Sequence, residues 1–370
     1  MSNAMGKAIY FLGVGKPLEA REYPLPDQLE PEAILVKTKM ATVCGSDMHS
    51  WRGRRPFPTP SVLGHEGVGN IIRLGNAVQR DTAGQSLAVG DRITWTIMAA
   101  CGHCTFCRVH GLEQKCLDLF KYGHVVSDIP PYFLGTFGEY VYLKPGTGVF
   151  KLPAEMSDET ASPLMCAAAT VAGGLDKAGV NPGDTVVIQG AGMLGLYASA
   201  FAKAMGAGQI IMVDVLDKRL ELASHYGADI LLNAENMGLG ELIETVEKQT
   251  GGMGADLVIE VAGFAAVVEV GVKLLRNGGR YLMHGAVYPD DHFKLQSHDV
   301  IIKCLSLYGL HNYGSKHLGM ALDLVLQTQD KYPYARLTGP RFPLTAKGVT
   351  DALLALENRE GIRPIVVPDS

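Results

Sequence analysis

Residues 185–206 constrain the fold of this chain more than any other segment. A short apolar run over 185–189 leads directly into a Gly-x-Gly-x-x-Gly pattern formed by Gly190, Gly192 and Gly195. A stretch rich in alanine and leucine follows and ends at a further glycine. This order predicts a buried strand, a tight turn and a helix, which together begin a βαβ unit.

The same alternation of strand-like and helix-like segments continues downstream. Four further short apolar runs follow, at 210–213, 257–261, 280–283 and 305–308. A second helix is predicted over 218–226, where a glycine again stops it. Strands that alternate with helices are typical of a doubly wound parallel sheet, so we predict an α/β fold with such a sheet over residues 158–305.

Residues 5–157 have a different character, with many glycines and prolines and short β-branched runs between closely spaced turns. This predicts an irregular β-rich domain, to which residues 306–370 are predicted to return with a final strand. The 33 basic and 38 acidic residues give a formal net charge of −5 without a long run of one sign, which argues against a nucleic-acid partner. No apolar segment approaches the ~20 residues of a membrane span and no signal peptide is evident, so we expect a cytoplasmic protein without a membrane partner.

The glycine pattern and an acidic residue downstream together predict a dinucleotide site. The glycines permit close backbone approach, and the helix that begins near Met193 and Leu194 can present its N-terminus to a pyrophosphate. Asp214 closes the next predicted strand about 20 residues further on, where a carboxylate accepts hydrogen bonds from the adenosine ribose and repels a 2′-phosphate. This favours NAD over NADP. Arg219 either pairs with a phosphate or is a solvated helix residue. The alternative for the whole motif is that its glycines serve only the turn and bind no dinucleotide.

Four of the seven cysteines lie within sixteen residues. They are Cys101, Cys104, Cys107 and Cys116. This spacing lets one loop surround a tetrahedral zinc ion, and four thiolates leave no open position, so the predicted zinc is structural. Without a secretory signal, clustered cysteines favour metal binding over disulfides. The alternative is that the four cysteines pack as small apolar side chains.

A second set of possible metal ligands is dispersed along the chain. Cys44 opens a Cys-Gly-Ser-Asp-Met-His run, His65 is followed by a glutamate, and Cys166 stands just before the predicted parallel sheet. Taken alone, each of them is explained as an ordinary buried side chain. Their joint presence is what points to a second metal site.

Taken in order, these motifs resemble those of the zinc-containing medium-chain alcohol and polyol dehydrogenases. The similarity rests on the run 44–49, on Gly-His-Glu-Gly-Val-Gly over 64–69, on the cysteine lobe and on the glycine motif, and it extends from about Lys7 to about Pro368. It implies a GroES-like catalytic domain, a Rossmann domain and an active site in the cleft between them. It also implies a homodimer or homotetramer built through the sheet edge near residues 305–310.

Carried over residue by residue, the resemblance implies a catalytic zinc with three protein ligands: Cys44, His65 and Cys166. Asp47 matches the residue that orients the zinc-bound histidine, and Glu66 matches an acid that can approach the metal. Ser46 and His49 match a relay that carries a proton from the substrate oxygen towards solvent. Thr170 matches a hydroxyl residue near the nicotinamide. The expected reaction is hydride transfer between NAD(H) and a small alcohol, aldehyde or ketone, with two zinc ions per chain.

Two features depart from the usual family pattern. The last gap in the cysteine lobe is one residue longer than usual, which leaves its local geometry open. Many polyol-oxidising members have glutamate where Cys166 stands, so the cysteine favours the thiolate-rich arrangement of alcohol dehydrogenases. The substrate also stays open, because Trp51, Arg52, Arg54 and Arg55 either line an anion-binding pocket or lie at the surface.

Two other functions fit parts of the sequence. A zinc-independent quinone or enoyl reductase would use NADPH, and the dispersed ligands and Asp214 both argue against it. A redox or zinc-storage protein would explain the cysteine lobe but leaves the glycine motif unexplained. Ser46 also has a simple structural alternative, the capping of a helix that starts near Asp47.

Overall fold

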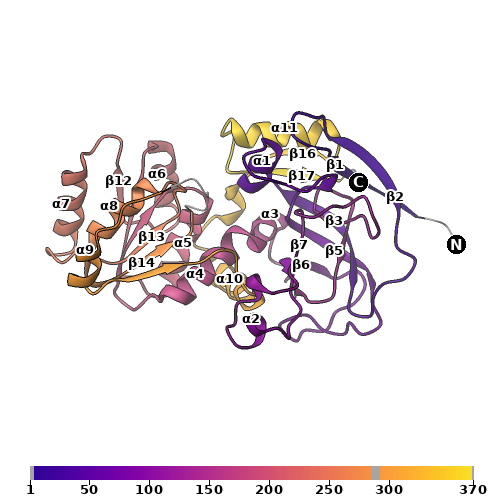
Figure 1. The fold of residues 1–370 in the computed structure, drawn as a ribbon, viewed down its shortest axis with the longest axis horizontal. Helices are drawn as coiled ribbons and strands as arrows, with labels where there is room; N and C mark the ends of the chain where they lie inside the picture. Colours follow the sequence, from indigo (N-terminus) through magenta and orange to yellow (C-terminus); the bar gives the residue numbers. More distant parts are fainter. Residues whose placement is uncertain (1–3, 286–291, 369–370) are drawn as a thin grey trace. The chain divides into compact units, whose positions relative to one another are not determined.

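The computed structural model describes residues 4–285 and 292–368, and contacts within the chain divide it into two units (Figure 1). The first unit contains the chain up to Cys166, Gly314–Leu322 and the part from Tyr334 onward. The second unit contains Ala167–Tyr313 and Asp323–Pro333. In Figure 1, the yellow C-terminal segment lies among the indigo N-terminal strands of the first unit.

The first unit is built on an eight-stranded sheet. Its strands are β3 (Ile34–Thr42), β5 (Glu66–Leu74), β6 (Arg92–Ala99), β7 (Phe120–Lys121), β8 (Tyr140–Leu143), β9 (Thr147–Lys151), β16 (Thr338–Pro343) and β17 (Arg363–Val367). The order is β16-β17-β3-β5-β6-β7, with β8 paired to β3 and β9 paired to β6. A three-stranded sheet has the order β2-β1-β4 and consists of β1 (Met5–Phe11), β2 (Glu19–Pro24) and β4 (Ser61–Val62).

Short helices connect these strands, and one longer helix covers the core. The helical segments are α1 (Gly45–Trp51), α2 (Thr105–Arg108), η1 (Glu113–Lys115), α3 (Asp158–Ala161), η2 (Ser162–Met165), η3 (Tyr334–Leu337) and α11 (Ala346–Glu357). The buried residues Val349, Ala352 and Leu353 follow helical spacing on α11 and join a core with Phe11 of β1 and Leu35 of β3. Burial of this apolar surface holds the C-terminal segment against the N-terminal strands.

The antiparallel pair β3 and β5 positions the dispersed metal-ligand residues. Thr42 at the end of β3 lies opposite Glu66 at the start of β5. Cys44 follows β3 closely and His65 directly precedes β5, so the two emerge at the same end of the pair. The segment η2 packs against β5 and leads directly into Cys166. Three distant parts of the sequence therefore meet at one strand end.

The second unit is a six-stranded parallel sheet. Its strands are β10 (Thr185–Gln189), β11 (Gln209–Asp214), β12 (Ile230–Asn233), β13 (Ala255–Glu260), β14 (Leu275–Met283) and β15 (Ser306–Gly309). Its helices are α4 (Ala167–Ala178), α5 (Met193–Ala204), α6 (Asp217–Ser224), α7 (Leu239–Gln249), α8 (Ala266–Leu274) and α9 (Ser297–Ile302). The order β12-β11-β10-β13-β14-β15 reverses direction between β10 and β13, where ligands bind in doubly wound sheets. Helices cover both faces, with α4 packed on α5 and α7 packed on α8 (Figure 1).

The elements around the glycine motif agree closely with the sequence prediction. The strand predicted over 185–189 is β10, and the helix predicted after the glycines is α5, which begins at Met193. Gly206 beyond this helix has a φ of 105°, a conformation that glycine adopts without strain.

Two unit boundaries differ from those expected from the sequence. Residues 158–166 were expected to join the parallel sheet, yet α3 and η2 belong to the first unit because η2 packs on its strands. Residues 306–313 were expected to return to the first unit, yet β15 pairs in parallel with β14. Helix α10 (Ser315–Thr328) begins in the first unit and ends in the second.

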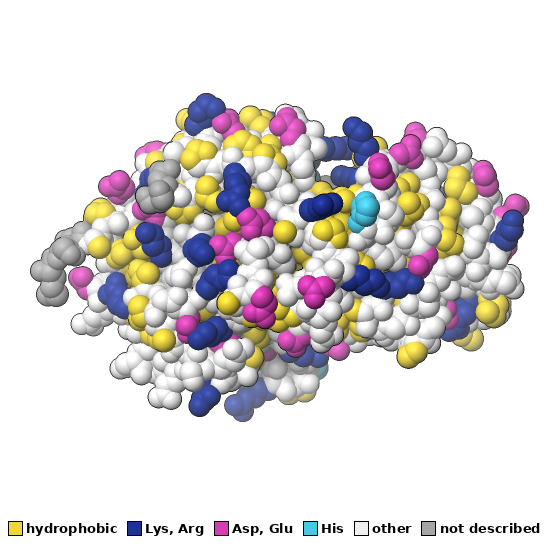
Figure 2. All heavy atoms as spheres, turned by 180° about the vertical axis from the view of Figure 1, so that it is seen from behind, with side chains coloured by type: hydrophobic (Ala, Val, Ile, Leu, Met, Phe, Trp, Pro, Cys, Tyr) yellow, Lys and Arg dark blue, Asp and Glu magenta, His cyan; other side chains and the backbone are white. Residues whose placement is uncertain are grey.

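The surface mixes charges of both signs. Figure 2 shows lysines and arginines interspersed with aspartates and glutamates over the face that it displays. Among residues 4–285 and 292–368, no helix has the length and apolar character needed to cross a bilayer.

Candidate active site and cofactor sites

The first unit brings Cys44, His65, Glu66 and Cys166 together. One potential ligand atom from each lies within 4.8 Å of the others, and the Cys44 and Cys166 Sγ atoms are 3.8 Å apart. Cys44, His65 and Glu66 are buried and Cys166 is half-buried. Two thiols, an imidazole and a carboxylate are ligand types that zinc accepts.

Asp47 holds two of these residues in position. Its carboxylate is 1% exposed and accepts hydrogen bonds from the backbone N–H groups of Cys44 (2.9 Å) and Gly64 (3.2 Å). The Nδ1 atom of His65 lies 3.2 Å from Oδ1 of the same carboxylate. One buried carboxylate thus fixes the backbone at Cys44 and lies against the His65 ring, next to which the family resemblance placed Asp47.

Glu66 is held by two residues that the sequence analysis did not identify. The Thr42 hydroxyl donates to Glu66 Oε2 at 2.7 Å, and Nε of the buried Arg363 lies 3.2 Å from the same oxygen. Glu66 Oε1 is buried and has no hydrogen-bond partner among the described residues. The signal for Arg363 was a single arginine at the start of the otherwise apolar final strand.

The side chains of this cluster have strongly perturbed acidities. The hydrogen bond with Cys166 is the main reason that the pKa of Cys44 lies well below its usual range, and the same bond raises the pKa of Cys166. Burial raises the pKa of Glu66 to about 8. Burial lowers the pKa of His65, but Asp47 and Cys44 outweigh it and bring this pKa to about 10. A bound cation would displace these protons, because metals bind thiolate and neutral imidazole.

Ser46 lies beside His65, and the alternative role given to it above is wrong. Helix α1 begins at Gly45 with Cys44 in the N-cap position, so Ser46 lies inside the helix and does not cap it. Its Oγ is 3.3 Å from Nε2 of His65. His49 lies three residues further on in the same helix, half-buried, and its Nδ1 accepts a hydrogen bond from Arg54 at 3.1 Å. That contact occupies the lone pair of Nδ1, so a proton can arrive there only after Arg54 releases it.

The four clustered cysteines meet in a lobe around α2 and η1. Their sulfur atoms all lie within 4.8 Å of one another, with distances of 3.5 Å between Cys104 and Cys107 and 4.0 Å between Cys104 and Cys116. All are free thiols. Backbone N–H groups of Leu117 and Cys107 are the main reason that the pKa of Cys104 falls to about 6. The longer last gap is absorbed by η1 and does not prevent Cys116 from joining the other three.

Both clusters fit zinc by their donor chemistry and spacing. Zn–S bonds of about 2.3 Å in a tetrahedron place two sulfur atoms about 3.8 Å apart. The sulfur pairs above are separated by 3.5 to 4.0 Å. The lobe offers four thiols, and the cluster at Cys44 offers two thiols, an imidazole and an acid whose Oε1 lacks another partner.

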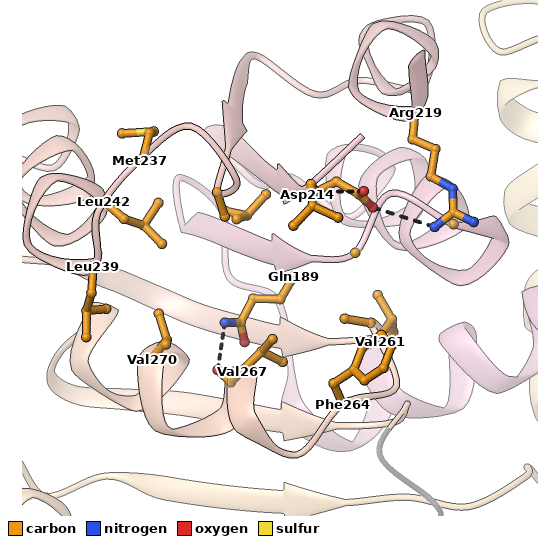
Figure 3. A pocket seen from close by; sticks show the side chains of 16 residues that line it. Gln189, Asp214, Arg219, Met237, Leu239, Leu242, Val261, Phe264, Val267 and Val270 are labelled. Atoms are coloured by element: carbon orange, nitrogen blue, oxygen red, sulfur yellow. Dashed lines mark hydrogen bonds and ion pairs between the residues drawn. The ribbon is translucent and has the colours of Figure 1, made fainter. Parts of the chain in front are cut away.

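A cavity of about 350 Å³ opens at the glycine motif of the second unit (Figure 3). Gly190, Gly192, Asp214 and Arg219 line it together with mostly apolar side chains from β11, α7, α8 and the loop after β13. Gln189, which the sequence analysis did not single out, also lines it and donates a hydrogen bond to the Val267 carbonyl. The cavity lies at the reversal of strand order between β10 and β13.

Two glycines of the motif, Gly192 and Gly195, have distinct roles. A Cβ at Gly195 would lie 1.9 Å from the Gly190 carbonyl oxygen, so this glycine permits the close approach of α5 to the turn. A Cβ at Gly192 would meet nothing within 4 Å, so the backbone before α5 faces open space. Gly192 is the N-cap of this helix, whose first N–H groups are therefore open to an anionic ligand.

Asp214 lies at the end of β11 and points into this turn. Its Oδ2 accepts from the Ala191 N–H at 2.7 Å, and its Oδ1 accepts from the N–H groups of Val215 (2.8 Å) and Leu216 (3.0 Å). Arg219 lies 3.9 Å from Oδ2 and is 44% exposed at its side chain (Figure 3). A carboxylate has about four acceptor positions, so one remains for a ribose hydroxyl.

The other predicted cofactor residues do not line this cavity. Met193 is buried and Leu194 half-buried at the start of α5, and Thr170 is half-buried on α4. The described contacts therefore support the adenosine side of the predicted site through Gly190, Gly192 and Asp214.

The chain is similar to known proteins over nearly its whole length. The alcohol dehydrogenase GroES-like domain model matches residues 30–154, and the zinc-binding dehydrogenase model matches residues 194–327. The chain is 33% identical to 5-exo-hydroxycamphor dehydrogenase of Pseudomonas putida over 94% of this chain and 95% of that protein. An alcohol dehydrogenase structure from Thermotoga maritima matches with a TM-score of 0.93 and 31% identity over 99% of this chain and all (100%) of that one. A zinc-binding dehydrogenase from Sinorhizobium meliloti 1021, bound to NADP, matches with a TM-score of 0.85 and 26% identity over 99% and 100% of the two chains.

Proposed function

The chain belongs to the zinc-dependent medium-chain alcohol dehydrogenases, and within this family we propose that it binds two zinc ions and prefers NAD to NADP. Membership makes it an oxidoreductase that moves a hydride between a nicotinamide dinucleotide and an alcohol or carbonyl compound. The predicted fold class, a GroES-like domain with a Rossmann-type parallel sheet, is confirmed.

One observation carries the assignment of the catalytic metal site. Cys44, His65 and Cys166 converge with Glu66, whose buried Oε1 has no other partner among the described residues. A buried carboxylate oxygen without a hydrogen bond is costly unless a cation compensates it. We assign the two cysteines and the histidine as ligands, with Glu66 held close by Thr42 and Arg363.

Residues of the first unit are assigned the other roles in the reaction, namely orientation of a zinc ligand and proton transfer. When bound, zinc supplies a Lewis acid that polarises the substrate oxygen, and the dinucleotide supplies the hydride acceptor or donor. Asp47 keeps the His65 ring oriented through its contact with Nδ1. Ser46 Oγ accepts the proton of the substrate hydroxyl while its own proton moves on towards His49.

The preference for NAD rests on Asp214. Its carboxylate is fixed by the Ala191 and Leu216 N–H groups beside the cavity, where it can accept a ribose hydroxyl and repels a 2′-phosphate. Arg219 is the group that would have to turn towards a 2′-phosphate if NADP were preferred. We place the nicotinamide near Thr170 by family resemblance.

The cysteine lobe is assigned a structural zinc. Its four thiols leave no position for a substrate, and Glu113 in its η1 segment accepts hydrogen bonds from the Ser315 N–H (2.6 Å) and hydroxyl (3.1 Å) at the start of α10. The lobe is thereby tied to a helix far along the chain.

We further propose a homodimer or homotetramer joined at the edge strand β15. Ile301 and Ile302, in α9 just before this strand, are 69% and 65% exposed. Light scattering at working concentration tests this, and a monomer would contradict it.

The proposed function is tested by turnover and cofactor preference on one preparation. Zinc-loaded protein should oxidise members of a panel of simple, polyol, hydroxy-acid and phosphonate-bearing alcohols with NAD, and more efficiently than with NADP. Removal of the metal by a chelator should abolish turnover. Turnover that persists without zinc, or that prefers NADPH, would instead support a quinone or enoyl reductase.

A further inference from the structure

Arg55 lies beside the proposed catalytic site and has no acidic partner among the residues that the structure describes. Its Nε donates to the Ser50 hydroxyl at 2.9 Å, and its Nη2 donates to the Ser46 carbonyl at 3.0 Å and to Nε2 of His124 at 3.1 Å. Its neighbours in sequence differ, because Arg52 and Arg54 both pair with Glu357. Of the three arginines in this segment, Arg55 is therefore the one whose side chain contacts Ser46 and His124 beside the site.

His124 fixes this guanidinium and remains neutral. Its Nδ1 lies 2.8 Å from the Tyr122 carbonyl and donates to it, which leaves Nε2 to accept from Arg55. Burial is the main reason that the pKa of His124 lies far below its usual range. The His124 ring lies 5.3 Å from the His65 ring, centroid to centroid. A single imidazole therefore separates Arg55 from a proposed zinc ligand.

One nitrogen of the Arg55 guanidinium, Nη1, is left without a hydrogen-bond partner among the described residues. Nε and Nη2 are occupied as described, and the Phe57 ring lies 5.8 Å from the guanidinium carbon. The two N–H groups of Nη1 have no hydrogen-bond partner among the described residues. Arginine is always charged, and the two N–H groups of Nη1 remain available as charged donors to oxygens of a carboxylate or phosphate.

Lys121 adds a second cation to the same place. It ends β7, three residues before His124, and is half-buried. Its ammonium has no ion pair or hydrogen bond among residues 4–285 and 292–368, and its carbonyl accepts a hydrogen bond from the His124 N–H at 3.2 Å. Arg55 donates to His124, and the His124 N–H donates to the Lys121 carbonyl, so two cations without an acidic partner among the described residues belong to one turn beside the proposed zinc site. Like charges in a partly buried site repel, and a bound anion would relieve this repulsion.

We propose that Arg55 and Lys121 bind an oxyanion of the substrate, so that this enzyme acts on a short alcohol or carbonyl compound that carries a carboxylate or phosphate-type group. The proposal rests on the proposed function, because it places this anion beside the zinc site. Arg55 contacts His124, whose ring centroid lies 5.3 Å from that of His65, so the proposed substrate is a short molecule with its anionic group near the reacting carbon.

The test compares matched substrates on zinc-loaded enzyme. One pair is a short hydroxycarboxylate and its methyl ester, and the other is a hydroxyalkyl phosphonate and its diester, so the two pairs distinguish the anion classes. Arg55→Gln and Lys121→Met remove the cations, and Arg52→Gln, which removes an exposed arginine paired with Glu357, is the control. Zinc content and melting temperature are recorded for each variant. If Arg55→Gln loses zinc, Arg55→Lys is used in its place, because it keeps the positive charge.

Wild-type enzyme should prefer one anionic compound over its ester, and each cation variant should lower kcat/KM for that compound about 10- to 100-fold, mainly through KM. The ester should change less than about threefold, since its binding uses no ion pair. Calorimetry with unreactive propanoate and methylphosphonate should show the same loss of affinity without turnover. Equal effects on both members of a pair, or weaker NAD binding with unchanged substrate KM, would overturn the proposal. Turnover of neutral alcohols alone would leave the proposed function standing and refute the anion site.

Discussion

Asp47→Asn tests the idea that one buried carboxylate organises the catalytic metal site. Three donors converge on Asp47: the N–H groups of Cys44 and Gly64 and the Nδ1 of His65. Asparagine keeps one oxygen, which can serve the two donors at Oδ1, and turns an NH₂ group towards the Cys44 N–H. Losing a charge-assisted hydrogen bond and leaving a buried donor unpaired costs about 2 to 4 kcal/mol. Loss of the partner that orients a metal-bound histidine typically weakens metal binding about 10- to 100-fold.

The assay is zinc retention in competition with a graded chelator, with the lobe zinc as an internal reference. Asp81→Asn is the matched control, because Asp81 is also a buried carboxylate and accepts from the backbone of Gln85 (2.8 Å) and Lys151 (2.9 Å), outside the metal clusters. Asp47→Asn should release one zinc at a lower chelator concentration, and Asp81→Asn should lower stability without this effect. Asp47 does not organise the metal site if Asp47→Asn releases zinc at a chelator concentration within threefold of the wild-type value, or if both variants release zinc equally.

Four further substitutions separate the remaining roles. Cys104→Ser should lower the melting temperature by at least about 5 °C while the rate per folded, catalytic-zinc-loaded enzyme stays within about twofold; full thermal stability would contradict a structural zinc. Asp214→Ala should weaken NAD binding about 10-fold or more and reduce discrimination against NADP, measured by calorimetry with both dinucleotides, and an unchanged preference would mean that another residue sets it. Ser46→Ala should keep its zinc yet slow the single-turnover hydride step about 100-fold. His49→Gln should slow this step less than Ser46→Ala does, and mainly at lower pH. An unchanged rate in Ser46→Ala would contradict the proposed proton relay.

The second unit was predictable because its signals are local. Short apolar strands and a glycine turn directly before a helix specify β10 and α5 without reference to distant residues. The edge strand β15 was harder to assign to a unit, since a short apolar run can join either sheet. Only its pairing with β14 decides the matter.

The metal ligands were predictable from spacing and resemblance, but their surroundings were not. Arg363 reaches Glu66 because β17 pairs with β3, and Arg55 reaches His124 because the chain after α1 folds back over the segment after β7. These contacts join residues 69 or more positions apart, and no local pattern announces them. The arginine segment 52–55 illustrates this limit, since one sequence pattern contains both surface ion pairs and a side chain directed at the site.

We propose that this enzyme binds one catalytic and one structural zinc ion. Zinc content and NAD-linked turnover, measured on the same preparation, test this proposal. Wild-type protein prepared with ample zinc should contain two zinc ions per chain. Cys44→Ala should contain one and lose turnover, whereas Cys104→Ser should lose the other and keep turnover in the fraction that remains folded. One zinc or none in the wild type, or a Cys44→Ala variant that retains both zinc and turnover, would contradict the account.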